Sequence, residues 1–279
     1  MRGNQPRRAR HLAVATALIA GVALAGCAQP DEATPGLSPG SSPSTTTVSP
    51  SATSPSTQPR ATTSSPSDKA GPTTQGAAAE QTVRTWLQAA RDGDLAKLES
   101  GLGTYSREQA KKLGGLEGVQ SGLAEGISAF LDAKTWAAHP IPRHDNTWLV
   151  VASGEVTREG MTETDARAWI VRAEHGKLVV ETFANPVPQV VAPGPGQKLD
   201  AAKPVVVDLP AGEVVAFVDN KDAGAQASTQ PAAGGGARVT VQPPAGGWPA
   251  GQHVVAVAVV PEEGQTSPWA SAATAFTVG

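Results

Sequence analysis

The stretch Gln252-His253-Val254-Val255-Ala256-Val257-Ala258-Val259-Val260 decides how the C-terminal part of the chain folds. Valines and alanines alternate over Val255–Val259, so both faces of a strand formed here are apolar. β-Branched residues favour strands, and a strand without a polar face has to be covered on both sides. The pattern therefore predicts a central strand of a β-sandwich.

Further strand-like segments flank this run and are separated by turns rich in proline and glycine. Short strands with frequent turns are typical of a β-sandwich, which we predict for residues 201–279. Asp219-Asn220-Lys221-Asp222 has the composition of a calcium loop, but Lys221 breaks the ligand spacing, so we predict a turn there. The flanking segments are Val205–Asp208, Glu213–Val218, Arg238–Val241 and Ala270–Val278.

The runs Pro249–Val257 and Ala273–Val278 resemble bacterial Ig-like or fibronectin-III-like domains. The resemblance rests on the strand pattern, because the cysteines of antibody domains are absent. It implies a role in spacing or adhesion, since such domains host many functions. Residues 187–200 are rich in proline and glycine, and we predict that they connect this domain to the preceding one.

The part of the chain before this connector starts with helical patterns. Apolar residues recur at helical spacing over Val83–Ala90, Asp92-Gly93 predicts the end of that helix, and Asp94 is the expected N-cap of the next. Ser106-Arg107-Glu108-Gln109 has the spacing of a capping box for a third helix. An apolar stripe over Leu116–Phe130 predicts a fourth.

After Trp136 the apolar period changes to two, which indicates antiparallel strands. Glu174-His175-Gly176-Lys177 predicts a tight hairpin turn between the last two of them. Helices followed by an antiparallel meander are typical of an α+β domain, which we predict for residues 76–186. The predicted strands are Trp136–Ile141, Thr147–Thr157, Asp165–Glu174 and Lys177–Phe183.

The opening Thr85-Trp86-Leu87-Gln88-Ala89-Ala90-Arg91-Asp92-Gly93-Asp94-Leu95-Ala96-Lys97-Leu98 resembles the NTF2-like (SnoaL-like) superfamily, in which a helix ending at a Gly-Asp step precedes a short helix. The resemblance implies an α+β cone, in which a curved antiparallel sheet wraps the helices. Members of the superfamily include small-molecule isomerases, polyketide cyclases, accessory domains of penicillin-binding proteins and catalytically silent lipoprotein domains. The expected fold is therefore this cone followed by an all-β sandwich.

If the cone forms, aromatic side chains are expected to line its mouth as an apolar ligand pocket. The alternative is that they fill the core of a small domain with few other large residues. The candidates are Trp86, Tyr105, Phe130, Trp136, Trp148 and Trp169.

The resemblance to the NTF2-like superfamily also implies candidate catalytic residues, because its enzymes use Asp, His or Tyr in the cone as an acid or base. His139, His144 and Asp145 form a polar group of that kind, with Tyr105 elsewhere, but their segment is interrupted by prolines and is predicted to be an exposed loop. Their spacing matches no zinc motif. We therefore predict no catalytic residue, no metal site and no cofactor.

Residues 28–75 are dominated by serine, threonine and proline and have almost no large apolar residues. Such a segment cannot bury enough surface to offset the entropy of ordering it, so a disordered linker is expected. It would hold the folded part away from its point of attachment. Clustered Ser and Thr with Pro also resemble O-glycosylated stalks.

Leu24-Ala25-Gly26-Cys27 follows a basic segment and the apolar run Leu12–Leu24, and it resembles the lipobox of bacterial lipoproteins. The run is too short to span a bilayer and fits a removable signal over residues 1–27. The resemblance implies that the Cys27 thiol receives a diacylglyceryl group, and palmitate is a typical acyl chain. Two acyl chains suffice for stable anchoring, so we predict a protein on the extracytoplasmic face of the cell membrane.

The charge balance excludes one class of partner. The chain has 22 Lys and Arg against 25 Asp and Glu, and four of the arginines precede Cys27, so the mature protein has 18 basic residues and a net charge of about −7. A negative surface repels nucleic acid. Cys27 is the single cysteine, and once it is lipidated no thiol remains for a disulfide or a nucleophile.

Three functions stay open on these grounds. The favoured one is a non-enzymatic lipoprotein of the cell envelope that binds or scaffolds a wall component or a protein partner. The second is a carrier or sensor that holds a small apolar ligand in the cone. The third is a cone enzyme of the cyclase or isomerase type.

Overall fold

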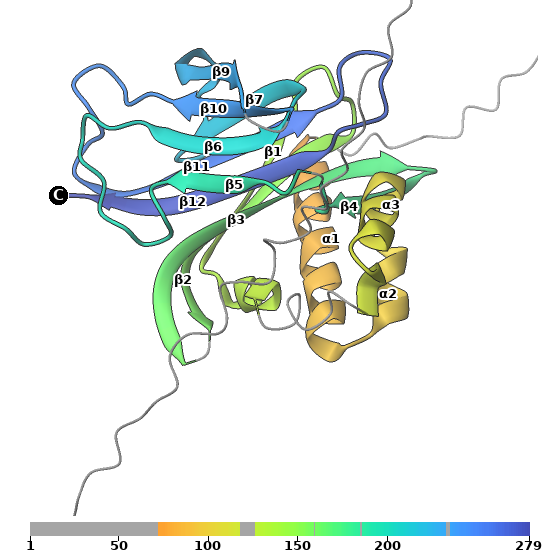
Figure 1. The fold of residues 1–279 in the computed structure, drawn as a ribbon. Helices are drawn as coiled ribbons and strands as arrows, with labels where there is room; N and C mark the ends of the chain where they lie inside the picture. The colour runs from red at the N-terminus through yellow and green to blue at the C-terminus, as the bar shows by residue number, and fades with distance from the viewer. Residues whose placement is uncertain (1–71, 118–125, 159, 185, 233–234) are drawn as a thin grey trace, which may run out of the picture. The chain divides into compact units, whose positions relative to one another are not determined.

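The structure is a computed structural model that describes residues 72–117 and 126–279, apart from residues 159, 185 and 233–234. By its internal contacts the chain divides into Met1–Ser64 and Ser65–Gly279, and every described residue belongs to the second unit. The described part is mostly β-sheet with few helices, and it contains a β-sandwich (Figure 1). The predicted signal peptide and all but the end of the predicted linker lie outside the described residues.

The helices of the described part precede the first strand, except for one short turn inside the sandwich. Helix α1 buries Val83, Trp86 and Leu87 on one face and ends at Asp92, where Gly93 takes a φ of 71°. The Asp94 side chain then accepts the Lys97 N–H, so the predicted N-cap of α2 is confirmed. The helices are α1 Pro72–Asp92, α2 Leu95–Ser100, α3 Thr104–Lys112 and the 3₁₀ turns η2 Ser128–Asp132 and η3 Gly224–Gln226. None of them is long and apolar enough to cross a membrane.

The predicted capping box at Ser106 is wrong. Helix α3 already begins at Thr104, so Ser106 lies inside the helix. Its buried hydroxyl accepts the N–H groups of Thr182 and Phe183 at 2.8 and 3.3 Å. The serine hydroxyl therefore holds the segment after strand β4 (Lys177–Glu181). Other residues accept the free N–H groups at the start of the helix. Of the fourth predicted helix, residues 118–125 lie outside the described residues, and Phe130 lies on the short turn η2.

Four antiparallel strands in the order β1-β2-β3-β4 form sheet A. Glu174 pairs with Lys177 across His175 and Gly176, whose φ angles of 51° and 77° confirm the predicted tight turn. Strand β3 starts earlier than predicted, because its hairpin partner β2 pairs with it along its whole length. The strands are β1 Thr135–Pro140, β2 Thr147–Arg158, β3 Met161–Glu174 and β4 Lys177–Glu181. We call residues 72–184, which contain α1–α3 and sheet A, the helical module.

The remaining strands form two four-stranded sheets, with the order β5-β6-β10-β9 in sheet B and β12-β11-β7-β8 in sheet C. The five predicted strands are confirmed, with small changes at their ends. Three short strands were not predicted, and one of them, β5, lies within the stretch 187–200 that was expected to be a connector and pairs with β6. The strands are β5 Gln189–Ala192, β6 Val205–Pro210, β7 Glu213–Val218, β8 Lys221–Asp222, β9 Ala227–Pro231, β10 Gly236–Val241, β11 Gly251–Val260 and β12 Ala270–Val278.

Strand β11 explains why its sequence has no polar face. Val255, Val257 and Val259 pack in the core between sheets B and C. Ala256 and Ala258 point the other way and pack against sheet A of the helical module. The strand therefore belongs to two cores, and its second apolar face is covered by a third sheet.

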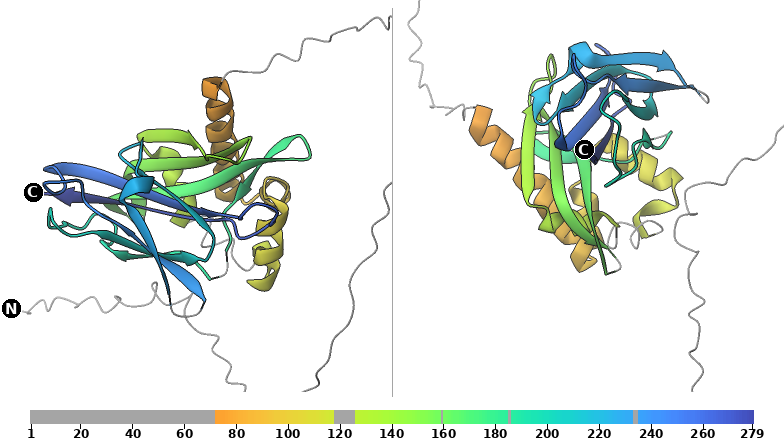
Figure 2. Two further views of the ribbon diagram at one scale, coloured as in Figure 1. Left: turned by 90° about the horizontal axis from the view of Figure 1, so that it is seen from above. Right: turned by 90° about the vertical axis from the view of Figure 1, so that its left-hand side faces the viewer.

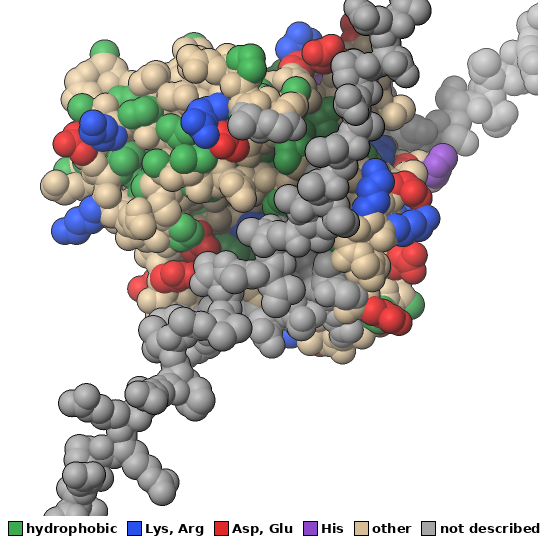
Figure 3. All heavy atoms as spheres, viewed as in Figure 1, with side chains coloured by type: hydrophobic (Ala, Val, Ile, Leu, Met, Phe, Trp, Pro, Cys, Tyr) green, Lys and Arg blue, Asp and Glu red, His purple; other side chains and the backbone are tan. Residues whose placement is uncertain are grey.

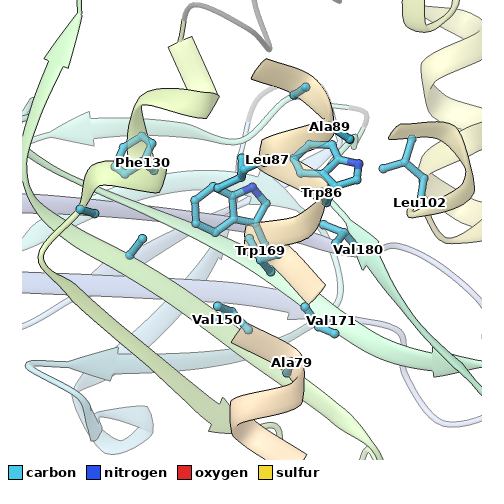
Figure 4. Close-up of a cluster of buried hydrophobic side chains, with 14 of the residues drawn as sticks. Ala79, Trp86, Leu87, Ala89, Leu102, Phe130, Val150, Trp169, Val171 and Val180 are labelled. Carbon is cyan, nitrogen blue, oxygen red and sulfur yellow. The ribbon is translucent and has the colours of Figure 1, made fainter. Parts of the chain in front are cut away.

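Sheet A is covered on both faces as well. Trp148 packs in the core with the helices, and Val150 and Trp169 point to the same side of the sheet (Figure 4). Leu149 and Ile170 face sheet C, where they meet side chains of β7 and β11. The layers are therefore the helices, sheet A, sheet C and sheet B, in that order (Figures 1 and 2). We call the contact between sheets A and C the seam.

Polar groups also cross the seam. The Ser271 hydroxyl of β12 donates a hydrogen bond of 2.9 Å to the Ala168 carbonyl of β3. Strands β3 and β12 lie against each other over much of their length. Because the seam is apolar at its centre and hydrogen-bonded at its side, the helical module and the sandwich are packed as one body in the described part of the chain.

Candidate functional site

The predicted pocket residues are mostly found in the core of the helical module. Trp86, Phe130, Trp148 and Trp169 are at most 5% exposed. The Trp86 indole donates to the Leu98 carbonyl at 3.1 Å and so joins α1 to α2. The Phe130 ring meets the Trp169 ring edge-on, with centroids 5.9 Å apart (Figure 4). These four aromatic side chains therefore fill the space between the helices and sheet A.

Trp136 and Tyr105 lie nearer the surface than the other four. Trp136 stacks on Trp169 at a centroid distance of 6.0 Å, and the Arg84 guanidinium covers its outer face at 4.0 Å. Tyr105 on α3 is half-buried and packs against both the sandwich core and the seam. Tyr105 therefore lies away from the aromatic cluster with which it was grouped.

One polar atom in this aromatic cluster has no partner. The Trp169 side chain is fully buried, and its indole N–H finds no acceptor among the described residues. A buried donor that loses its bond to water and gains no other costs about 1–3 kcal/mol. The aromatic cluster therefore contains one unused hydrogen-bond donor.

Asp145 is exposed in the loop between β1 and β2, as predicted, whereas His139 and His144 are half-buried and only His144 lies in that loop. His139 is on strand β1, and its ring stacks on the Phe217 ring of β7 at 4.4 Å. His144 meets the Trp269 ring edge-on at 5.9 Å. Arg143 between them is ion-paired with Glu213. The prolines shape a turn that faces the sandwich, so the segment closes the seam.

A second histidine site lies at the end of the sandwich. His253 on β11 is 6% exposed, and its Nδ1 lies 2.7 Å from an oxygen of Asp219. Its Nε2 lies 2.8 Å from the Pro249 carbonyl oxygen. A neutral imidazole carries a single N–H, so both bonds require the doubly protonated ring. Burial opposes this charge, but the bonds to Pro249 and Asp219 outweigh it and raise the pKa of His253 above its ordinary value.

A hollow of about 280 Å³ opens beside this pair. Its wall includes the indole of Trp248 and the side chains of Lys221 and Asp222. Gln226 also lines the hollow, and its buried Oε1 has no hydrogen-bond partner in the part of the chain that the structure describes. The charges of the lining are mixed, and on the face in Figure 3 acidic and basic side chains likewise lie beside one another. The hollow offers polar contacts of both signs to a partner.

A buried ion network closes the rim of the helical module at the start of α3. Glu181 is 0% exposed and accepts the Ser106 N–H at 2.8 Å and the Arg172 Nε–H at 2.9 Å. Glu174 accepts the Thr104 N–H at 3.0 Å and pairs with Arg172 at 3.1 Å. The two carboxylates therefore satisfy the N–H groups that begin the helix, as capping side chains do.

The two carboxylates of this network differ in pKa. Burial raises the pKa of Glu181, and the bonds to Ser106 and Arg172 only partly offset it. Burial also acts on Glu174, but the bonds from Thr104 outweigh it and lower the pKa. Both oxygens of each carboxylate already have donors. The arrangement therefore suits a structural role, with Arg172 also lying over the Trp269 ring at 5.1 Å.

Neither of these two sites could be recognised from the sequence pattern. Glu174 and Glu181 look like ordinary hairpin charges, and only the pairing of β3 with β4 brings them together around Arg172. Asp219 and His253 are 34 residues apart. Among the described residues, no group of three or more His, Cys, Asp or Glu side chains is placed to hold a metal ion. Cys27 and the Leu24-Ala25-Gly26 that precede it lie outside the described residues.

Comparisons with known proteins add little to this picture. No protein-family model matches the chain, and no curated protein matches it. A solved structure of titin Ig tandem domains A164-A165 resembles it with a TM-score of 0.20 and 8% identity, over 52% of this chain and 98% of that one. So weak a likeness carries no argument.

Proposed function

We propose that this chain is a lipid-anchored protein of the cell envelope that binds or scaffolds a wall component or an envelope protein, without catalysis. The observation that supports the location is Leu24-Ala25-Gly26-Cys27 directly behind an apolar run. The Ser/Thr/Pro-rich residues 28–75 would serve as the spacer between the membrane and the folded part. The protein would then sit on the extracytoplasmic face of the cell membrane.

The shared core supports the binding role. Two modules joined by a flexible connector present their surfaces in changing orientations, whereas modules joined by a packed seam present one fixed surface. In this chain Leu149 and Ile170 of the helical module pack on Ala256 and Ala258 of the sandwich. We assign residues 76–186 to an NTF2-like cone and residues 201–279 to an Ig-like domain, with residues 187–200 contributing an edge strand to the latter.

Lipidation can be tested directly. Cells that express the full chain are fed a palmitate analogue with a detectable tag, and the protein is isolated and compared with Cys27→Ser. We expect label on the natural sequence alone and loss of Cys27→Ser from the membrane fraction. Equal labelling of both, or a natural protein found in the cytosol, contradicts the proposal.

The binding role needs a separate test. The full chain in detergent is sedimented with purified cell walls and, in parallel, cross-linked in intact cells. Binding to walls, or one reproducible cross-linked envelope protein, is the expected result. If a correctly lipidated protein gives neither result, the binding role is contradicted and the lipid anchor is unaffected.

One observation favours a second candidate function, a carrier of a small apolar ligand. The Trp169 indole N–H, which has no acceptor among the described residues, lies between Phe130 and Trp136, and a ligand with one hydrogen-bond acceptor would satisfy it if these packed side chains moved apart. Native mass spectrometry of the full chain tests this. A retained small molecule in the natural protein and its loss in Trp169→Phe support the carrier, and a ligand-free mass in both contradicts it.

A further inference from the structure

The turn between β7 and β8 is the part of the sandwich that both histidine sites hold. It consists of Asp219 and Asn220, whose φ angles are 48° and 65°. Asp and Asn tolerate this left-handed conformation better than most residues, but it still has to be held by neighbours. The Asp219 side chain accepts the Val254 N–H at 2.9 Å, and the Asp219 N–H donates to the Val254 carbonyl at 2.9 Å. The turn is thereby tied to β11.

His253 holds the first residue of this turn. Its Nδ1 and Nε2 face the Asp219 carboxylate and the Pro249 carbonyl, which are both acceptors. Trp248 and Phe276 pack against the ring with centroids 5.7 and 5.6 Å away. If the ring loses one proton, one of the two hydrogen bonds is lost, and an unprotonated ring nitrogen then faces an acceptor oxygen beside the buried ring.

His139 holds the second residue from the other side of the seam. Its Nε2 lies 3.2 Å from the Asn220 Oδ1, and its ring lies flat on Phe217 at an interplanar angle of 20°. Phe217 is itself 9% exposed and belongs to the seam core. The Nε2–H can donate to Asn220 in the neutral and in the doubly protonated ring, but a charge on this half-buried ring has to be taken out of water, which disfavours the second proton.

We propose that the Asp219-Asn220 turn is a pH-sensitive latch on the seam, which is closed when His253 carries two ring protons and His139 carries one. The latch lies where the helical module meets the sandwich, so opening it exposes Phe217 and loosens the end of the seam. A protein outside the cell membrane meets changes of pH from which the cytoplasm is protected. The latch is a property of the fold and stands whether or not the chain is lipidated.

The charged groups around each ring fix the direction of the response. Asp219 favours the charge on His253, and Lys221 and Asp222 line the same hollow with opposite charges. Around His139, burial lowers the pKa, and the Asn220 bond and the charge of Glu80 on α1 oppose this without reversing it. The two histidines are therefore shifted in opposite directions from their ordinary value of 6.5.

The directions of the two pKa shifts define the pH range in which the latch is most stable. The pKa of His253 is raised in the folded state, so its contribution to the stability of the closed latch is complete below pH 6.5. This contribution is lost as the pH rises through the pKa of the folded state. The pKa of His139 is lowered in the folded state, so its contribution to the stability of the closed latch is complete above pH 6.5. This contribution is lost as the pH falls through the pKa of the folded state. The latch is therefore firmest near pH 6.5 and loosens on either side.

Nitrogen NMR of the histidine rings in the full chain in detergent tests the protonation states without any variant. At pH 6.5 we expect two N–H signals from His253 and one from His139. A His253 ring with a single N–H, or a His139 ring with two, overturns the proposal. The exposed His175, whose side chain is 93% exposed, serves as the internal reference.

Hydrogen exchange tests the latch itself. Protection of the Val254 and Asp219 amides, corrected for the intrinsic rate, should fall on both sides of pH 6.5, by about tenfold for each unit by which a folded pKa differs from its unfolded value. His253→Gln should remove the alkaline fall, His139→Gln the acid fall, and His175→Gln neither. Unchanged profiles in both latch variants overturn the proposal.

Discussion

The helical module and the sandwich reach a dry core by different means. In the helical module, three large aromatic residues, Trp86, Phe130 and Trp169, fill the core, and an ion network closes the rim. In the sandwich, valines fill the core, and its described side-chain ion pairs lie at or near the surface, apart from that of His253. The two modules fit together at the seam, because the small alanines of β11 leave room for the large side chains of sheet A. A strand can therefore serve two cores if one face is bulky and the other is small.

The largest expected effect separates the two kinds of ion pair. Arg172→Met leaves the fully buried Glu181 without its cation, and breaking a buried pair in this way costs about 3–5 kcal/mol. Arg238→Met removes an equally well-formed pair with Asp208, but Arg238 is 48% exposed, so we expect a much smaller loss of stability. Denaturant unfolding of the full chain in detergent measures both. Equal losses contradict the distinction between the rim and the surface.

The next effect tests whether the seam is a core of its own. Leu149 is fully buried and faces the sandwich, so Leu149→Ala should cost about 2–5 kcal/mol. Val150, the next residue, faces the helices, and Val150→Ala is the matched variant for the other face of the same sheet. Similar losses in the free energy of unfolding would show that both faces of sheet A contribute to stability as packed cores. If Leu149→Ala is neutral while Val150→Ala is not, the seam is a weak surface contact.

A third change fills the seam instead of emptying it. Ala258→Leu inserts three heavy atoms between sheets A and C, and overpacking of this kind costs about 1–3 kcal/mol. The same substitution at Ala275, which is also fully buried but on the edge strand β12, gives a comparison outside the central strand. Thermal unfolding measures both variants. A stabilised Ala258→Leu protein would show that the seam contains space that the alanines leave unfilled.

The smallest effect concerns the outer contact of the seam. His144→Ala removes an edge-on contact with Trp269, which is worth about 0.5–1.5 kcal/mol. His175→Asn removes an exposed ring that makes no such contact among the described residues, at a φ of 51° that asparagine tolerates, and we expect almost no change in stability. Urea unfolding at a fixed pH distinguishes them. Identical midpoints for the two variants contradict a stabilising role of the His144 contact.

The sequence predicted the strands that have a clear period and missed those that do not. The apolar alternation around Val257 marked β11 as a strand covered on both faces. It could not show what covers the second face, because that depends on packing with residues about 100 positions away. Strands β5, β8 and β9 are short, and the exposed Ser228, Thr229 and Gln230 of β9 carry no apolar pattern.

The site was predicted less well than the fold, for a related reason. The six aromatic residues were expected either to line a pocket or to fill a core, and periodicity cannot distinguish these two arrangements. His139 stood in a segment interrupted by prolines and was expected to be solvated, whereas Phe217, 78 positions later, covers its ring. The lipid anchor at Cys27 stays a prediction, because it rests on the sequence motif alone.

The central structural claim is that the helical module and the sandwich unfold together. Fluorinated tryptophan gives each of the six tryptophans its own NMR signal, so Trp148 and Trp169 report on the helical module and Trp248 on the sandwich. In a urea titration of the full chain in detergent, the shared seam predicts that all these signals change at one midpoint. Two separate midpoints, with Trp248 keeping its folded signal after Trp169 has lost its own, would contradict the claim.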